Sequence, residues 1–104
     1  MDQEFLAMRI AQLRMNKGVS ARDMSLSLGQ ADNYINHIEN KKSLPSITSF
    51  FYICEYFNIT PMEFFDEGNS NPEQLKDLLA DLKRLDSKAR SHIADLVKEL
   101  LRRQ

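Results

Sequence analysis

The sequence predicts an all-α protein, with five short helices in an N-terminal domain and a two-helix hairpin after it. Apolar residues recur at helical rather than alternating spacing along the chain. Helix start signals separate these segments, and the clearest is Thr60-Pro61-Met62-Glu63, which combines an N-cap threonine, a proline at N1 and a capping-box glutamate. The apolar stretch at 47–53 also favours a helix over a strand, because it follows a serine cap and keeps helical spacing.

The first helix is expected over residues 2–17. Leu6, Ile10 and Leu13 recur at i, i+4 and i+7, so they form one apolar stripe that faces a core. Gly18 stands where a glycine commonly ends a helix in the left-handed conformation.

Two shorter helices follow, joined by a tight turn at Gly29. The first begins at the N-cap Ser20, with Asp23 as a weaker form of the capping box. The second is expected from about Ala31 to Asn40. Their inward-facing residues are expected to be Met24, Leu28, Ile35 and Ile38.

A fourth helix is expected after the cap Ser46, and a fifth, which begins after Thr60, carries Phe64 and Phe65. Their apolar residues complete the core of the N-terminal domain. The residues expected to be buried in the fourth helix are Ile47, Phe50, Ile53, Cys54 and Phe57.

The chain is expected to divide into a domain at 1–66, a linker at 67–71 and a helical hairpin at 72–104. The linker is polar and contains glycine and asparagine, which are typical of a loop. Asn71-Pro72 opens the first helix of the hairpin, and Asp86 or Ser87 caps the second.

Both hairpin helices carry an apolar stripe, which Leu79 and Leu101 widen beyond what one hairpin needs. This surplus favours a homodimer over the alternative, in which the hairpin folds back on its own N-terminal domain. The residues expected to form the dimer contacts are Leu75, Leu78, Leu82, Leu85, Ile93, Leu96, Val97 and Leu100.

The charge balance is slightly acidic, with a formal net charge of -1. Residues 1–66 hold six Lys/Arg and eight Asp/Glu. Nucleic-acid-binding domains are usually basic, so any binding to DNA must depend on local placement of a few cations. There is no apolar stretch that would span a membrane or direct secretion, and Cys54 is the only cysteine, which fits the reducing cytoplasm.

No catalytic or metal-binding constellation stands out in the sequence. His37 has no cysteine, histidine or acidic partner at ligand spacing, and His92 lies in another segment. The chain also lacks a glycine-rich phosphate loop and a recognisable pair of nucleophile and base. We therefore expect no enzymatic activity, no metal and no cofactor.

Several short motifs follow one another from Ile10 to Phe65: LRMNKGVS, the Leu28-Gly29 turn, YINHIEN, Pro45-Ser46 and NITPMEFF. In this order and spacing they resemble the Cro/cI-like (Xre) family of helix-turn-helix transcriptional regulators. The resemblance implies a five-helix, lambda-repressor-like domain whose third helix enters the major groove of double-stranded DNA. Two positions depart from the family: Ala21 replaces the usual glutamine, and Lys41 replaces the usual glycine.

The outward edge of the expected recognition helix is polar, because Ile35 and Ile38 face inward. Amide side chains can bond adenine bidentately, and a carboxylate can accept a hydrogen bond from cytosine. Asn33 and Asn36 are the strongest candidates, and the alternative role for Asp32 is to stabilise the helix N-terminus. The residues predicted to contact bases are Asp32, Asn33, Asn36 and His37.

The resemblance also implies phosphate contacts around this edge, just beyond the helix, and an ion pair between Arg14 and Glu39 that ties the recognition helix to the first helix. Arg22, in the first turn of the second helix, is a further candidate. Tyr34 either offers its hydroxyl to a phosphate or serves only for packing, and the phosphate contact is favoured. The residues predicted to contact phosphate are Arg22, Tyr34, Asn40, Lys41 and Lys42.

These features together predict a cytoplasmic, sequence-specific transcriptional regulator, a repressor that acts as a dimer. This sequence shows no ligand domain, so a signal is expected to come from a protein antagonist or from proteolysis rather than from a small molecule, with the hairpin as the alternative receptor. The alternative is a protein-interaction module on the same scaffold, such as an antitoxin-like protein. The acidic balance and Ala21 favour the alternative, whereas Lys41-Lys42 and the asparagine-rich edge oppose it.

Overall fold

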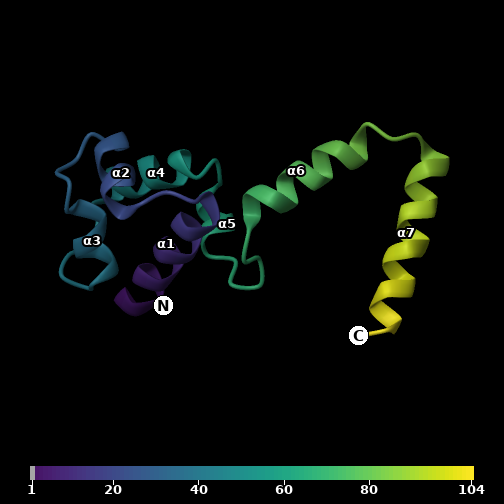
Figure 1. Ribbon diagram of the computed structural model, residues 1–104, viewed down its shortest axis with the longest axis horizontal. Helices are drawn as coiled ribbons and strands as arrows, with labels where there is room; N and C mark the ends of the chain where they lie inside the picture. Colours follow the sequence, from purple (N-terminus) through teal and green to yellow (C-terminus); the bar gives the residue numbers. More distant parts are fainter. Residues whose placement is uncertain (1) are drawn as a thin grey trace. The chain divides into compact units, whose positions relative to one another are not determined.

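The computed structural model describes residues 2–104 and places seven helices and no strand in that range, which confirms the all-α fold. The chain forms two compact units, one up to Glu73 and one of Gln74–Gln104. The first unit contains α1 (Gln3–Lys17) and α2 (Ala21–Ser27) (Figure 1).

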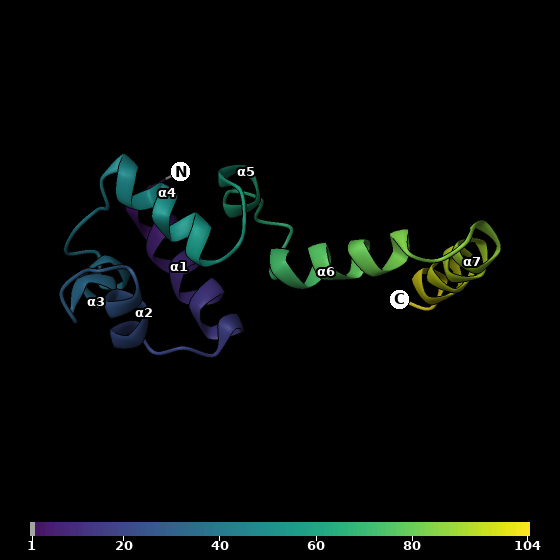
Figure 2. The same ribbon diagram turned by 90° about the horizontal axis from the view of Figure 1, so that it is seen from above.

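The remaining helices of the first unit are α3 (Tyr34–Glu39), α4 (Ile47–Tyr56) and α5 (Pro61–Phe64). In both views α1 runs between the α2–α3 pair and α5 (Figure 2). Two further helices follow, α6 (Pro72–Lys83) and α7 (Ser87–Arg102), which belong mainly to the second unit.

Side-chain caps fix the starts of α2, α4, α5 and α7 where the sequence predicts them. Thr60 and Glu63 form both halves of a capping box: the Glu63 N–H donates to Thr60 Oγ1 at 3.1 Å, and the Thr60 N–H donates to Glu63 Oε1 at 2.9 Å. Ser20 Oγ accepts from the Asp23 N–H at 3.0 Å. Gly18 ends α1 at φ 75°, a left-handed conformation that costs glycine little.

The core of the first unit gathers apolar residues from all five of its helices, and α1 supplies Ile10 and Leu13 as expected. Ile47 was expected to be buried but is 68% exposed, because it is the first residue of α4 and points away from the core. Cys54 is buried among these side chains, and this burial raises the pKa of its thiol to about 11. The buried apolar cluster is Ile10, Leu13, Met24, Ile35, Ile38, Phe50, Ile53, Cys54, Phe57, Ile59 and Phe64.

The segment at 67–71, expected to be a linker, belongs to the first unit, which extends to Glu73. Asn16 Nδ2 donates a hydrogen bond to the carbonyl oxygen of Ser70 at 2.7 Å. Pro72 is fully buried, in a small depression that Leu13 also lines. The chain therefore leaves the first unit only after the start of α6.

The second unit buries none of its side chains between residues 74 and 104. Asp86 caps α7, since its Oδ1 accepts from the Ala89 N–H at 2.8 Å. The large apolar side chains of the two helices remain open, from 37% exposed at Ile93 to 62% at Leu101, and Leu82 is partly buried. Among the described residues, no helix is both long enough and apolar enough to cross a membrane.

Candidate nucleic-acid interface

The α2–α3 pair is joined by a longer turn than the sequence suggested. Helix α3 begins at Tyr34, three residues later than expected, and Asn33 is its N-cap. Asp32 and Asn33 therefore lie in the turn, where short polar side chains that compete for backbone hydrogen bonds are favoured over helix interiors. Gly29, at φ 72°, supplies the left-handed residue that this turn requires.

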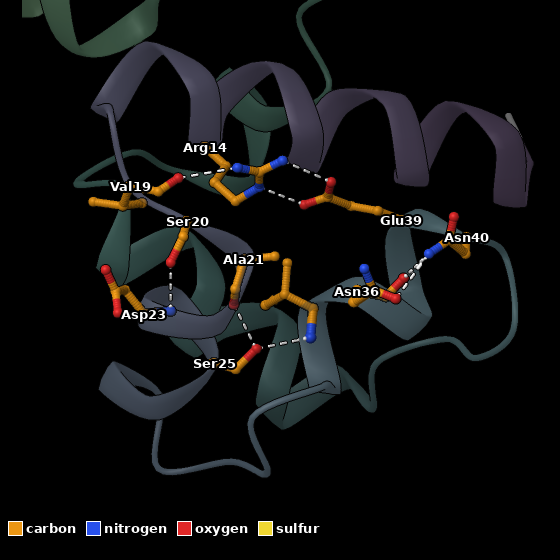
Figure 3. A network of polar contacts seen from close by, with 10 residues as sticks. Arg14, Val19, Ser20, Ala21, Asp23, Ser25, Asn36, Glu39 and Asn40 are labelled. Atoms are coloured by element: carbon orange, nitrogen blue, oxygen red, sulfur yellow. Dashed lines mark hydrogen bonds and ion pairs between the residues drawn. The ribbon is translucent and has the colours of Figure 1, made fainter.

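Ser25 locks α2 and α3 together from inside the domain (Figure 3). Its hydroxyl is fully buried, donates to the carbonyl oxygen of Ala21 at 2.7 Å, and accepts from the backbone N–H of Ile35 at 3.0 Å. This N–H lies in the first turn of α3, where no helical carbonyl can satisfy it. The serine thus fixes the start of α3 against α2, a role that the sequence analysis did not assign to it.

Changing Ser25→Ala should lower the free energy of unfolding by about 1–3 kcal/mol, because the buried N–H of Ile35 loses its partner. Urea unfolding, followed by tyrosine fluorescence, measures this change in the first unit, which holds all three tyrosines. Thr48→Ala, which removes an exposed hydroxyl from α4 of the same unit, is the control. Equal midpoints for the two variants would contradict this role of Ser25.

Arg14 and Glu39 connect α1 with the end of α3 (Figure 3). Arg14 Nε lies 2.8 Å from Glu39 Oε2, and Arg14 Nη2 donates to Glu39 Oε1 at 3.1 Å, so the pair is bidentate. Arg14 Nη1 also donates to the carbonyl oxygen of Val19 at 3.0 Å. Both side chains are less than a fifth exposed, and the bond to Glu39 raises the pKa of Arg14.

The outward edge of α3 carries amide and imidazole groups that are already in contact with one another. Asn40 Nδ2 donates to both the carbonyl oxygen and the Oδ1 of Asn36, each at 2.9 Å. Asn33 Nδ2 lies 3.4 Å from His37 Nε2. Asn33, Asn36 and Asn40 are exposed and His37 is half-buried, so the edge is accessible to a large ligand.

The cations around α3 are mostly engaged within the protein. Arg22 Nη1 lies 3.5 Å from Asp32 Oδ2, and Lys41 Nζ lies 3.7 Å from Glu4 Oε1. Lys42 is exposed and forms no ion pair among residues 2–104. The structure thus brings together Arg22 and Asp32, which the sequence analysis had assigned to phosphate and to base contacts respectively.

Lys41 occupies a strained position directly after α3. Its φ is 61°, in the left-handed region that non-glycine residues enter at an energetic penalty. Gln3 Nε2 donates to its carbonyl oxygen at 3.0 Å and helps to hold this conformation. The glycine that the resembling family has at this position would avoid the strain but would remove the cation.

Tyr34 packs against the core instead of presenting its hydroxyl to solvent. The hydroxyl oxygen is buried and has no hydrogen-bond partner within residues 2–104. A covered oxygen cannot contact a phosphate unless the side chain moves. We therefore assign Tyr34 to packing and leave it out of the proposed phosphate contacts.

Arg9 is a second residue whose role the sequence analysis missed. It is 3% exposed, and its guanidinium donates to the carbonyl oxygens of Phe64 at 2.7 Å, Glu63 at 2.8 Å and Asp66 at 3.3 Å, and also to Gln12. Burial lowers the pKa of Arg9, and the charge of Asp66 partly opposes this shift. Arg9 joins α1 to the end of α5.

Two helices joined by a turn, the second with a polar outer edge and a buried inner face, define a helix-turn-helix domain. A family model described as a helix-turn-helix domain matches residues 7–69, more than half of the chain. The chain belongs to this helix-turn-helix family, which suggests a DNA-binding regulator. Neither the curated proteins nor the solved structures contain a match.

Proposed function

We propose that this protein is a sequence-specific transcriptional regulator of the Cro/cI-like (Xre) type, a repressor that binds double-stranded DNA as a homodimer. The observation that carries the proposal is the way α3 is held. Ser25 fixes its start and Arg14 fixes its end, while its outer edge stays polar and accessible. A rigid element with an open polar edge is what base recognition requires.

Base contacts are assigned to Asn33, Asn36 and His37. An asparagine can bond adenine bidentately in the major groove, and each such contact is worth about 1–3 kcal/mol of discrimination. The hydrogen bonds between Asn36 and Asn40 support this assignment, because they order the amide of Asn36 before DNA arrives. Asp32 is withdrawn from this set, since it lies in the turn and faces Arg22.

Phosphate contacts are assigned to Arg22, Asn40, Lys41 and Lys42, which lie around the two ends of α3. So few cations predict a modest dependence of affinity on salt concentration, because each neutralised phosphate contributes about 0.9 to the slope of log K against log[salt].

Dimerisation is assigned to the second unit. A single helix-turn-helix domain covers one half-site, and two half-sites lie roughly 34 Å apart on one face of DNA. The apolar side chains of α6 and α7 are about half exposed, a pattern that favours association with another surface. The residues proposed to form the interface remain Leu75, Leu78, Leu82, Leu85, Ile93, Leu96, Val97 and Leu100.

The test is selection of bound sequences from random duplex DNA with the full-length protein, at low and at physiological salt. A palindrome with half-sites about ten base pairs apart is the expected result. If folded protein enriches no sequence, a protein-interaction module is the better-supported function. The excess of acidic residues in 1–66 favours that alternative.

Paired variants then separate base contacts from phosphate contacts. Asn33→Ala/Asn36→Ala should weaken binding to the selected sequence by about 2–4 kcal/mol and leave binding to random DNA nearly unchanged. Lys41→Ala/Lys42→Ala should weaken both and reduce the salt slope by about 1–2. Lys83→Ala/Lys88→Ala, in the second unit, is the control for loss of charge. The same effect of the first two pairs on both kinds of DNA would refute the assignment.

A further inference from the structure

Two exposed ion pairs flank α3, one near each end, and each joins a cation to a carboxylate from a neighbouring segment. Arg22 of α2 faces Asp32 of the turn at 3.5 Å. Lys41, just after α3, faces Glu4 of α1 at 3.7 Å. The four side chains are between 52% and 69% exposed, so the pairs lie in solvent and not in the core.

Their high solvent exposure distinguishes them from the Arg14–Glu39 pair, which is mostly buried and fixes the end of α3. An exposed ion pair shifts an equilibrium by only about 1.5- to 5-fold. A pair this weak adds little to the fold but can be exchanged readily for another anion. DNA phosphate is such an anion, and Arg22 and Lys41 are two of the proposed phosphate contacts.

We propose that Asp32 and Glu4 compete with DNA phosphates for Arg22 and Lys41, and so limit the affinity of the protein for any duplex. The inference rests on the proposed function. When DNA binds, each cation exchanges its carboxylate for a phosphate, and the released carboxylate stays close to the DNA, where it is repelled. Each exchange also gives a smaller net release of counterions, because the carboxylate left beside the DNA replaces part of the negative charge that the cation neutralises.

This competition gives the acidic excess of the first unit a role. Binding to non-specific DNA depends almost entirely on phosphate contacts, so a protein whose cations are engaged dissociates readily from sites without the correct bases. The contacts between α3 and bases would then have to supply most of the binding free energy. Asp32 thus acts against phosphate binding, in contrast to the base contact that the sequence analysis assigned to it.

The test uses the full-length variants Asp32→Asn and Glu4→Gln, singly and together, with a labelled random-sequence duplex over a range of salt concentrations. Each single change should raise affinity at low salt by about 2- to 5-fold, and the two should multiply. The slope of log K against log[salt] should steepen by up to about 0.9 for each cation that is freed.

Two comparisons make the test specific. Glu55→Gln removes the same charge from an exposed site on α4 and controls for net charge. In an Arg22→Gln background, Asp32→Asn should no longer raise affinity beyond that control. If Asp32→Asn and Glu4→Gln behave like Glu55→Gln while the wild-type protein binds duplex DNA, the inference fails and the proposed function stands. If no variant binds duplex DNA at any salt concentration, both are overturned.

Discussion

Changing Arg9→Met should lower the free energy of unfolding of the first unit by about 3–5 kcal/mol, among the largest effects of any single substitution in this chain. Methionine fills much of the same space but donates no hydrogen bond. The buried carbonyl oxygen of Phe64 would then lose its donor, and the carbonyl oxygen of Glu63 would be left with its backbone contact with the Asp66 N–H at 3.3 Å. These acceptors belong to the backbone, so no second substitution can remove them and recover the lost stability.

Urea unfolding followed by tyrosine fluorescence measures this effect. Because marginally stable proteins tolerate only a few kcal/mol of loss, Arg9→Lys serves as a milder variant: it keeps the charge but cannot reach all the carbonyls, so an intermediate midpoint is expected. Arg22→Met removes an exposed arginine of the same unit and should shift the midpoint far less. If Arg9→Met and Arg22→Met unfold alike, the structural role assigned to Arg9 is incorrect.

Changing Arg14→Met should cost about 3 kcal/mol of stability and should also abolish selective DNA binding. The carboxylate of Glu39 would keep its low exposure but lose its bidentate partner, and the carbonyl of Val19 would lose its donor. Since the end of α3 is held through Glu39, its orientation should relax even in molecules that remain folded. Affinity for a selected sequence should therefore fall more than affinity for random DNA.

A double-mutant cycle of Arg14→Met and Glu39→Gln separates the ion pair from the other contacts of either residue. A coupling free energy above about 1.5 kcal/mol is expected for a close, largely covered pair. The cycle of Arg22→Met and Asp32→Asn is the control and should give at most about 1 kcal/mol, because that pair is exposed. Equal coupling in the two cycles would argue against a special role for Arg14.

The sequence predicts the start of a helix correctly where a side chain within the first turn caps it. Ser20 and Thr60 each cap the helix they were expected to cap, and of the two candidates Asp86 and Ser87 it is Asp86 that caps α7, because a cap depends on residues within one turn. The spacing of apolar residues predicts a start for α3 near Ala31, whereas the helix begins at Tyr34, with Asn33 at the N-cap position. Asn33 makes no side-chain capping bond to the helix, so neither a cap nor the spacing of apolar residues locates this start.

The contacts that join distant segments could not be obtained from local patterns. Arg9 meets carbonyl groups more than fifty residues away, and its position on α1 resembles that of any polar residue beside an apolar stripe. Ser25 likewise has no local pattern that distinguishes it from other helical serines. The Arg14–Glu39 pair was expected only from a family resemblance. The pairing of Arg22 with Asp32 depended on the turn that the sequence analysis had made too short.

Chemical modification of the buried Cys54 thiol reports local opening of the first unit. With its pKa raised to about 11 and almost no exposed surface, the thiol supplies very little reactive thiolate at neutral pH while the core is closed. A thiol-modifying reagent can then react at an appreciable rate only in molecules whose core has opened. Because this is the chain's only cysteine, the alkylation rate reports opening of the first unit and is not affected by motions of the second unit.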